Sequence, residues 1–593
     1  MNGLKPIRSQ AAHPVAIVLL GLGCYANTLG NGFVFDDSAY LASAMVRELE
    51  IGEIFAANWL GLDIYRPLAL LSLGCDFLLY GEAPMGFHLT NALLHAINGL
   101  LLYALARELV SHGQAALWAA LVYICHPLQT EVVGWVSARG DLLASSFFLG
   151  GFLAYLSGRR TASWALYAAA VLSKETAVIL PAVLLLHACW IERAAGGWWT
   201  RVTDWCKSHW GYAVALGAVL ALRFGVLGGA DASAGPASTN FLAELDIAPR
   251  WATVVAIWAR YALLLVVPLR LSADYSFASI PPVASPLDPW FIAGLIFVTA
   301  SVALPWWTRS RSLAFATAFL WLSLLPVSNV FVLAPSGMAE RYLHLGLIAA
   351  TLAIGWGVAR APVLLRLWPL GGVVVLLLSA ATIGRNRDWR SDLSLFSAVL
   401  EYYPDNARAH DNLAYSYYRR GDFGRAVYHY QRAIDIQPTR LRAHFNLGML
   451  YSQARRYDAA LASFKTALAL HPTHVETHFN TGLIYQKMQR YAEAIGHYRA
   501  VLDLDPGHAK TRYNIGRAYE RTDRLSEAVG QYNALIELNP AAAKAYYRLG
   551  EVYYRLGNIR QMTESWTALL RIEPDHANAR RVREIIGQNS RSE

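Results

Sequence analysis

The sequence predicts an all-α protein, built from a polytopic helical membrane domain and a helical-repeat solenoid that follows it. Three observations support this prediction. Apolar runs of about 20 residues, the length that spans a bilayer, recur from the N-terminus to about residue 389. Beyond that point the chain is polar and repeats its pattern every 34 residues. Of the 593 residues, 55% are hydrophobic and 16% are charged, which fits two regions of opposite character better than one soluble domain.

The first region contains eleven candidate membrane spans. Lys5 and Arg8 precede the first span, as in a signal peptide, but no small-residue cleavage site leads into a polar segment. We therefore expect a retained first helix and a multi-pass integral membrane protein. The candidate spans lie near residues 13–31, 87–110, 114–131, 134–157, 161–173, 175–193, 208–228, 288–306, 311–334, 340–360 and 367–385.

Basic residues between the candidate spans predict the orientation, because loops rich in Lys and Arg face the cytoplasm. These residues are Arg107, Arg159, Arg160, Arg193, Arg201, Lys207, Arg309, Arg311, Arg360 and Arg366. The crossings are consistent only if residues 251–270 do not cross, and Arg260 at the centre of that segment suits an interfacial helix. The loop with Asp36 and Asp37 and the repeats are then both expected on the outer side.

A constant period of 34 residues marks the second region. Prolines, glycines, alanines, tyrosines and bulky aromatic residues all follow it. The prolines are Pro404, Pro438, Pro472, Pro506, Pro540 and Pro574, and the glycines are Gly448, Gly482, Gly516 and Gly550. The pattern matches the tetratricopeptide repeat, a two-helix unit in which small residues let the helices approach and a large aromatic side chain fills the gap between units.

The repeats set the predicted domain organisation. About five full repeats cover residues 407–576, and residues 390–404 resemble a single capping helix. We therefore divide the chain into a membrane domain, residues 1–389, and a repeat domain, residues 390–593.

Asparagine recurs at one position of the first helix in four successive repeats, although it is a poor helix former. The residues are Asn412, Asn446, Asn480 and Asn514, and Arg548 takes the place in the fifth repeat. In tetratricopeptide arrays this helix lines the concave groove, so a row of amides could bind the backbone of an extended acceptor peptide. The alternative is that Asn was copied with the repeat, and the sequence leaves both readings open.

Two adjacent carboxylates, Asp36 and Asp37, follow the first apolar span. Like charges side by side are costly beside a bilayer, so the pair suggests a function. Asp36 could take the proton of an attacking hydroxyl as a general base. Asp37 could raise the basicity of Asp36, orient it or hold the acceptor, because two close carboxylates push their pKa values apart.

Further ionisable and polar residues gather at the ends of the spans on the same predicted side. Four cations, Arg66, Arg139, Lys174 and Arg341, are candidates for binding a donor phosphate. The cavity around them is expected to include His126, Glu131, Asp141, Glu175, Glu340 and His344, with His88, Asn91, Asp274 and Tyr275 nearby. For any one of these residues an ion pair that ties two helix ends together explains its presence equally well. As a group on one face they favour a functional cavity.

The cysteine pattern and the loop motifs indicate which cofactors to expect. The five cysteines form no CxxC pair, so neither a metal site nor a disulfide framework is predicted, and dependence on a divalent metal stays open. No G-x-G-x-x-G opens a helix after a strand, so a lipid-linked sugar is the expected donor in place of a sugar nucleotide. The net charge of +9 is thinly spread, and no nucleic-acid partner is expected.

Together these features resemble the transmembrane and tetratricopeptide-repeat protein O-mannosyltransferases and their bacterial relatives. The motifs are FVFDDSAYL after the first span, YRPL, HP-x-x-T-E-x-V-x-W at 126–135, R-x-D-L-L at 139–143, SKE at 173–175, ERYL at 340–343 and the trailing repeats. The resemblance implies a GT-C glycosyltransferase that inverts the anomeric carbon and uses dolichyl- or undecaprenyl-phosphate sugars. It places Asp36 at the catalytic base position. Classical protein O-mannosyltransferases have Glu where this chain has Asp37, so the sugar, expected to be mannose, stays open.

The expected function is sugar transfer from a polyprenyl phosphate to a protein Ser or Thr hydroxyl on the extracytoplasmic side. The repeats would bind the acceptor protein, and membrane lipids would surround the first domain. We expect a bacterial inner membrane with periplasmic repeats, or an endoplasmic reticulum membrane with lumenal repeats in a eukaryote. The main alternative is a membrane-anchored repeat scaffold without catalysis. A transporter and a polysaccharide enzyme are weaker alternatives.

Overall fold

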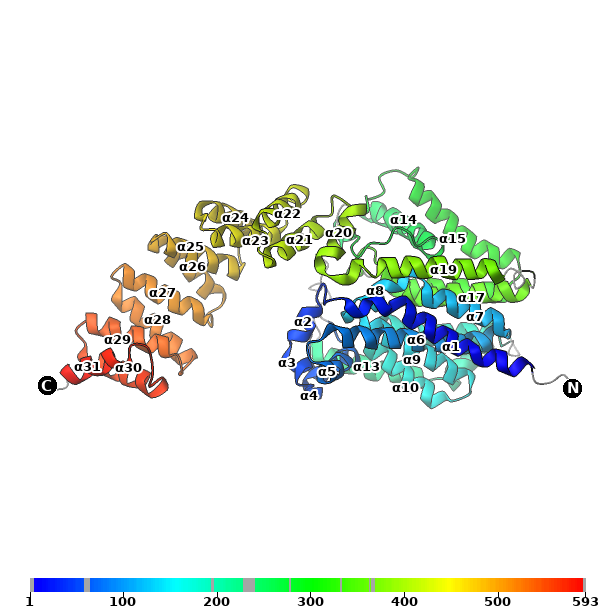
Figure 1. Cartoon of the computed structure of the whole chain (residues 1–593), viewed down its shortest axis with the longest axis horizontal. Coiled ribbons are helices and arrows are strands. Elements are labelled where there is room, and N and C mark those ends of the chain that lie inside the picture. Colours follow the sequence, from blue (N-terminus) through cyan, green and yellow to red (C-terminus); the bar gives the residue numbers. More distant parts are fainter. Residues whose placement is uncertain are drawn as a thin grey trace. The chain divides into compact units, whose positions relative to one another are not determined.

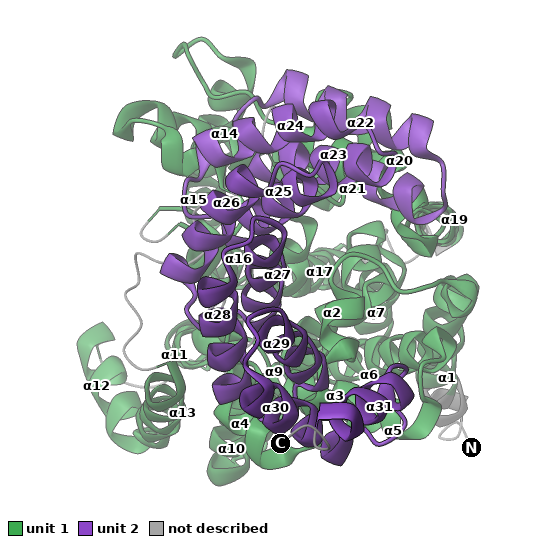
Figure 2. Ribbon diagram, turned by 90° about the vertical axis from the view of Figure 1, so that its left-hand side faces the viewer, with its two compact units in different colours: residues 1–413 green, residues 414–593 purple. Residues whose placement is uncertain are grey.

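The computed structural model is helical throughout, and its described residues contain no β-strand (Figure 1). It describes residues 5–57, 64–192, 197–227, 240–276, 279–330, 333–361, 363 and 368–589. The chain forms two compact units, residues 1–413 and residues 414–593 (Figure 2). The all-α fold predicted from the sequence is confirmed.

Unit 1 is the larger, and its helices vary widely in length. The α-helices with membrane-domain residues are α1 (Lys5–Tyr25), α2 (Asp37–Ala42), α3 (Ala44–Arg47), α4 (Ile51–Ala56), α5 (Pro67–Tyr80), α6 (Pro84–Val110), α7 (Gly113–Cys125), α8 (Thr130–Gly134), α9 (Arg139–Leu156), α10 (Arg160–Ser173), α11 (Leu180–Trp190), α12 (Trp198–Ser208), α13 (Gly211–Leu227), α14 (Ile247–Val266), α15 (Pro289–Trp307), α16 (Arg311–Leu324), α17 (His344–Arg360) and α19 (Trp368–Arg385). Helix α20 (Asp392–Tyr402) and the start of α21 (Ala407–Arg419) also belong to this unit.

Helices α6, α7, α9 and α17 pack against one another at the centre of unit 1. Their buried face is rich in alanine and in large aromatic residues such as Tyr123 and Phe148, both fully buried. Small residues let these helices approach closely, as is usual for helices packed in a membrane. The core therefore gives the polar residues at the helix ends a rigid support.

Among the described residues, five helices are long and apolar enough to cross a bilayer, or seven if each of two bent helix pairs counts as one span. The sequence predicted eleven. The five are Ala12–Gly30, Pro84–Val110, Pro289–Trp307, Glu340–Arg360 and Pro369–Arg390. Several other apolar segments form helices of 10 to 17 residues. The number of membrane spans therefore stays a prediction, because shorter or bent helices can also cross a bilayer.

The predicted interfacial segment 251–270 forms most of α14, which is not among the helices that meet the criteria for a span. Its Arg260 guanidinium lies over the ring of Trp290 in α15, 4.3 Å from the ring centroid. This contact gives the charge a partner at the helix centre.

A break between α7 and α8 determines where Glu131 lies. Helix α7 ends at Cys125, and the chain bends by 50° into the segment Pro127–Gly134. Pro127 has no backbone N–H to continue the helix, and the His126 ring accepts a hydrogen bond from the Leu128 N–H at 3.3 Å in its place. After the break, the buried Glu131 side chain contacts Arg341 of a distant segment.

The second unit is a stack of paired helices with the 34-residue period. After α21 come α22 (Phe423–Ile436), α23 (Leu441–Gln453), α24 (Tyr457–Leu470), α25 (Val475–Lys487), α26 (Tyr491–Leu504), α27 (Ala509–Arg521), α28 (Leu525–Leu538), α29 (Ala543–Arg555), α30 (Ile559–Ile572) and α31 (Ala579–Asn589). Pairs α21/α22 to α29/α30 coincide with the five predicted repeats. The unit boundary after Leu413 lies further along the chain than the domain boundary proposed at residue 389.

Glycine in the first helix of four of the five repeats makes room for an aromatic side chain of the second helix. A Cβ on Gly482 would lie 2.6 Å from the ring of Tyr498. We expect Gly482→Ala to lower the free energy of unfolding by about 1–3 kcal/mol, the usual effect of overpacking, although Ala is the better helix former. Denaturant titration followed by circular dichroism would measure it. Gly496→Ala is the matched control, because its Cβ would meet open space, and it should stabilise slightly. Equal effects of both substitutions would contradict the packing argument.

Candidate functional site

Asp36 and Asp37 lie between two helices of unit 1. A 3-10 helix ends at Gly30, and α2 begins at Asp37, with Asp36 as its N-cap. Phe35, just before them, has a φ angle of 58°, in the left-handed region that a bulky residue rarely adopts. Such conformations persist only where surrounding contacts hold them, often at functional sites.

Asp37 is fully buried, and both oxygens of its carboxylate accept hydrogen bonds. Its Oδ2 accepts from the Val34 N–H at 3.0 Å, and its Oδ1 accepts from the Ser137 N–H at 2.8 Å and from the Ser137 hydroxyl. Burial raises its pKa to about 7, although these hydrogen bonds favour the charged form, and the charge of Asp36 raises it further. Asp37 therefore fixes the loop to residue 137, and because it is fully buried it offers no surface to a substrate.

Asp36 has a different environment from its neighbour. Its side chain is half-buried, and within the described part of the chain its Oδ1 has no hydrogen-bond partner. Burial raises its pKa, while Ser137 and the positive charge of Arg341 oppose the increase. A carboxylate with a raised pKa and an unoccupied oxygen has the properties of a general base.

The loop is held from the far end of unit 1 by residues that sequence reasoning missed. The Phe35 N–H donates to Asp392 Oδ1 at 2.8 Å, and the Gly32 N–H donates to the Arg390 carbonyl at 3.0 Å. The Arg408 guanidinium lies 5.4 Å from the centroid of the Phe35 ring. No local signal connects these segments, because more than 350 positions separate them in the chain.

Arg341 is fixed but still accessible. Glu131 accepts from the Arg341 backbone N–H at 2.8 Å through Oε2 and from its Nη1 at 2.5 Å through Oε1. The guanidinium also lies over the Trp135 ring, 5.4 Å from the centroid. The Arg341 side chain is 20% exposed, so part of the guanidinium can meet another anion.

Two further ion pairs form at adjacent positions of the SKE segment. Arg66 binds Glu175 through Nε at 2.9 Å and through Nη2 at 2.5 Å, and its side chain is 25% exposed. Lys174 binds Asp141 at 2.5 Å, and both side chains are buried. Arg66 is therefore open to an anionic ligand, whereas Lys174 is enclosed and acts on the site only through its field.

Tyr40 connects the aspartate loop to the Arg66 ion pair. Tyr40, Arg66 and Ser137 line one narrow cavity. Burial raises the pKa of Tyr40 to about 12; the charge of Asp36 also raises it, whereas the charge of Arg66 lowers it. Tyr40 was not predicted as a site residue, although its place in FDDSAYL, one helical turn after Asp36, could have suggested it.

Arg139 has a structural environment. Its guanidinium is fully buried, and it donates to Asp76 at 2.5 Å, to the Asn91 side chain at 2.6 Å and to the Phe87 carbonyl at 2.9 Å. No surface remains for a phosphate. We therefore assign it to the support of α5, α6 and α9, in place of the phosphate contact that the sequence suggested.

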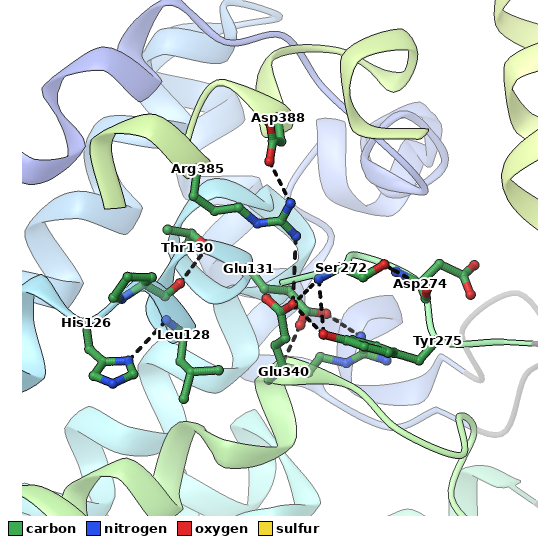
Figure 3. Close-up of polar contacts among 12 residues, drawn as sticks. His126, Leu128, Thr130, Glu131, Ser272, Asp274, Tyr275, Glu340, Arg385 and Asp388 are labelled. Atoms are coloured by element: carbon green, nitrogen blue, oxygen red, sulfur yellow. Dashed lines mark hydrogen bonds and ion pairs between the residues drawn. The ribbon is translucent and has the colours of Figure 1, made fainter. Parts of the chain in front are cut away.

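Glu340 anchors the segment beside Arg341 (Figure 3). Its Oε1 accepts from the Tyr275 hydroxyl at 2.9 Å and from the Ser272 N–H, and Arg385 approaches it at 3.8 Å. Arg385 in turn binds Asp388 at 2.6 Å. Glu340 is fully buried, so its role is to position its neighbour.

The two histidines of the predicted cavity are buried as well. His126 contacts the Leu128 N–H through Nδ1, and its Nε2 lies 3.3 Å from the Leu265 carbonyl. His344 Nδ1 lies 2.6 Å from Gln129 Oε1. Both rings support the broken helix around residue 127.

The asparagines of the repeats occupy equivalent positions. Each is the sixth residue of its helix and half-buried. Asn480 donates to the Glu476 carbonyl at 2.7 Å, and Asn514 donates to the Lys510 carbonyl at 2.8 Å. In both, the amide nitrogen is engaged within the helix, which orients the amide group. The remaining predicted positions are Asn412 in α21 and Asn446 in α23.

Among the described residues, no group of three or more His, Cys, Asp and Glu side chains could hold a metal ion. The charge of the cluster comes from its own arginines, lysine and carboxylates.

Family models match two parts of the chain. Residues 241–302 match the model described as "Protein O-mannosyl-transferase TMTC, DUF1736". Tetratricopeptide-repeat models match residues 414–454, 445–509, 522–557 and 543–576. The first match contains α14 and most of α15, together with the Tyr275 loop that holds Glu340.

Curated relatives match over most of the chain. Protein O-mannosyl-transferase F38B6.6 of Caenorhabditis elegans is 24% identical, over 68% of this chain and 60% of the relative. TMTC3 of Mus musculus is 26% identical, over 71% and 50%. TMTC4 of Homo sapiens is 26% identical, over 69% and 64%. The chain thus spans about half to two thirds of the length of these relatives.

Among solved structures, YrrB, described as a TPR protein with an unusual peptide-binding site, is 22% identical with a TM-score of 0.30. The match covers 32% of this chain and 97% of that chain. The matches to the TMTC model over residues 241–302 and to the tetratricopeptide-repeat models confirm the family resemblance that the sequence motifs indicated.

Proposed function

We propose that the chain is a multi-pass membrane glycosyltransferase that moves mannose from a polyprenyl-phosphate carrier to a Ser or Thr hydroxyl of a protein. The environment of Asp36 carries the proposal. Asp36 presents an oxygen without a partner among the described residues, its pKa is raised, and the charge of Arg341 acts on it. The names of the curated relatives support the choice of mannose and of a protein acceptor.

Asp36 acts as the base in this scheme. Its carboxylate takes the proton of the acceptor hydroxyl while that oxygen forms a bond to the anomeric carbon. The bond from the anomeric carbon to the phosphate oxygen breaks, and the phosphate leaves with the electron pair. Attack opposite the leaving group inverts the anomeric configuration. Asp37 holds the loop so that the Asp36 oxygen keeps its place.

Arg341 and Arg66 bind the leaving phosphate. They are the two cations of the predicted set that keep exposed surface, at 20% and 25% of the side chain. Glu131 and Glu175 hold them in fixed geometry, which lowers the entropy lost on binding phosphate. Lys174 does not contact the phosphate, because its buried ammonium is paired with Asp141; it acts on the phosphate only through its electric field. The donor is a dolichyl- or undecaprenyl-phosphate sugar, whose lipid chain lies among the apolar helices.

The repeats bind the acceptor protein in this proposal. The amide nitrogens of Asn480 and Asn514 are engaged within their helices, so their Oδ1 atoms can accept hydrogen bonds from the N–H groups of an extended peptide. Such contacts recognise the backbone and are tolerant of sequence. The repeats and the aspartate loop both lie on the extracytoplasmic side, which for a bacterial chain is the periplasm.

The pH dependence of transfer tests the role of the aspartate pair. Because the pKa of Asp36 is raised, kcat/KM should rise with pH through a limb that lies above the ordinary range of aspartate, about pH 4. Membranes that contain the chain would be supplied with a labelled polyprenyl-phosphate mannose and an acceptor peptide between pH 5 and 9. A limb near pH 4, the ordinary range of aspartate, would contradict the assignment.

Unfolding does not explain the expected loss of transfer activity at low pH. A raised native pKa means that the stability linked to Asp37 is fully present below about pH 4 and is lost as the pH rises towards 7. Acidification therefore lowers activity while this group favours folding. Unfolding midpoints at pH 5.5 and 7.5 provide the control, and absence of any transfer at every pH would favour a scaffold without catalysis.

A further inference from the structure

A second polar site lies at the opposite end of unit 1 from Asp36. Helix α17 begins beside Arg341, whose charge acts on Asp36, and ends at Arg360. A helix of this length spans about 26 Å. Helix α15 ends at Trp307 and α16 begins at Arg311, so the turn between them lies at the same end as Arg360.

Two adjoining cavities occupy this end, with volumes of about 440 and 660 Å³. They share Trp190, Arg309 and Arg311, and the larger one also reaches Arg360. Helices α11, α15, α16 and α17 contribute to the walls, so the space is formed by the packed helix ends and not by one loop.

The charge of these cavities is positive and uncompensated. Arg309 and Arg311 are exposed and form no ion pair within the described ranges, and Arg360 donates to the Ser312 hydroxyl at 3.0 Å. No acidic residue is found among the described residues that line the cavities. The nearby Glu192 approaches His187 at 3.2 Å.

Aromatic residues place the cavities at the level of lipid head groups. Trp306 and Trp307 are 82% and 80% exposed at the end of the most lipid-accessible candidate span. Indole side chains favour the membrane interface, where their apolar rings and N–H groups are both satisfied. An anion that enters here therefore comes from the bilayer surface.

We propose that this site binds the phosphate head group of an anionic phospholipid. Arg309, Arg311 and Arg360 contact the phosphate, and Trp306 and Trp307 contact the glycerol and upper acyl region. Basic pockets between helix ends bind such head groups, and each Arg near the surface contributes to the attraction. The site is separate from the donor site, and the inference holds whatever reaction occurs at Asp36.

Lipid retention tests the proposal. The purified full chain would be reconstituted with phosphatidylcholine containing a small fraction of phosphatidylglycerol, and the bound phosphatidylglycerol counted by native mass spectrometry. Arg309→Gln with Arg311→Gln should weaken its binding about thirty-fold, which corresponds to about 1 kcal/mol for each charge removed. Unfolding temperatures confirm that both proteins are folded.

The control removes the same charge at the same end of the unit. Arg159 and Arg160 are exposed, lie at the far end of α9 and do not line the cavities. Arg159→Gln with Arg160→Gln should leave phosphatidylglycerol binding within about two-fold of wild type. Equal weakening by both double substitutions, or displacement of the lipid by inorganic phosphate at equal concentration, would overturn the proposal.

Discussion

Asp36→Asn is expected to lower the rate of sugar transfer by about 10²–10⁴-fold, the usual contribution of a general base. Asn has nearly the same size as Asp but accepts no proton at neutral pH. The Asp36 Oδ1 has no hydrogen-bond partner in the described part of the chain, so its replacement should leave folding intact. Single-turnover transfer from a labelled polyprenyl-phosphate mannose would measure the effect, with donor affinity measured separately.

Asp37→Asn is the informative comparison. The amide nitrogen would replace an oxygen that accepts a hydrogen bond from Val34 or Ser137. A buried donor would then face another donor, so the variant should lose stability as well as activity. Retention of more than a tenth of wild-type transfer in the Asp36 variant would remove that residue as the base.

Arg139→Met is expected to have the largest effect on stability. The substitution leaves the buried Asp76 carboxylate without its cation and deprives Asn91 and the Phe87 carbonyl of a donor. Breaking a buried ion pair on one side costs about 3–5 kcal/mol. The fall should appear as a lower unfolding temperature in detergent, before any activity is measured.

The double variant separates structure from phosphate binding. Arg139→Met with Asp76→Leu removes both charges and should recover much of the lost stability, because apolar replacements of a buried pair are often tolerated. A single variant that unfolds like wild type but binds the donor more weakly would restore the phosphate role that the sequence suggested for Arg139.

The sequence was most informative where the structure depends on local repetition. In a two-helix repeat the packing residues recur every 34 residues. The contact between Gly482 and Tyr498 can therefore be predicted from their positions in the repeat. The membrane helices carry no such period. Hydropathy cannot show that α7 ends at Cys125 because Pro127 follows, and the predicted span 114–131 consequently crosses a bend.

The region of the candidate site could be predicted from the sequence, but the roles of its individual residues could not. The position of Asp36 and Asp37 after an apolar span is a local signal. Which of the two is buried depends on Ser137, a hundred residues away, and on the backbone at Phe35. Arg139 is a second example. The sequence suggested that its charge could bind a phosphate, but Asp76 in α5 and the Phe87 carbonyl in α6 already occupy its guanidinium.

The support that Phe35 receives from Asp392 and Arg408 determines where the chain can be divided for experiments. A fragment cut at residue 389 would keep Asp36, Arg66 and Arg341, yet it would lose the side chains of Asp392 and Arg408 that contact Phe35. A shortened chain should therefore extend at least through Leu413, so that Asp392 and Arg408 still hold the loop that carries Asp36.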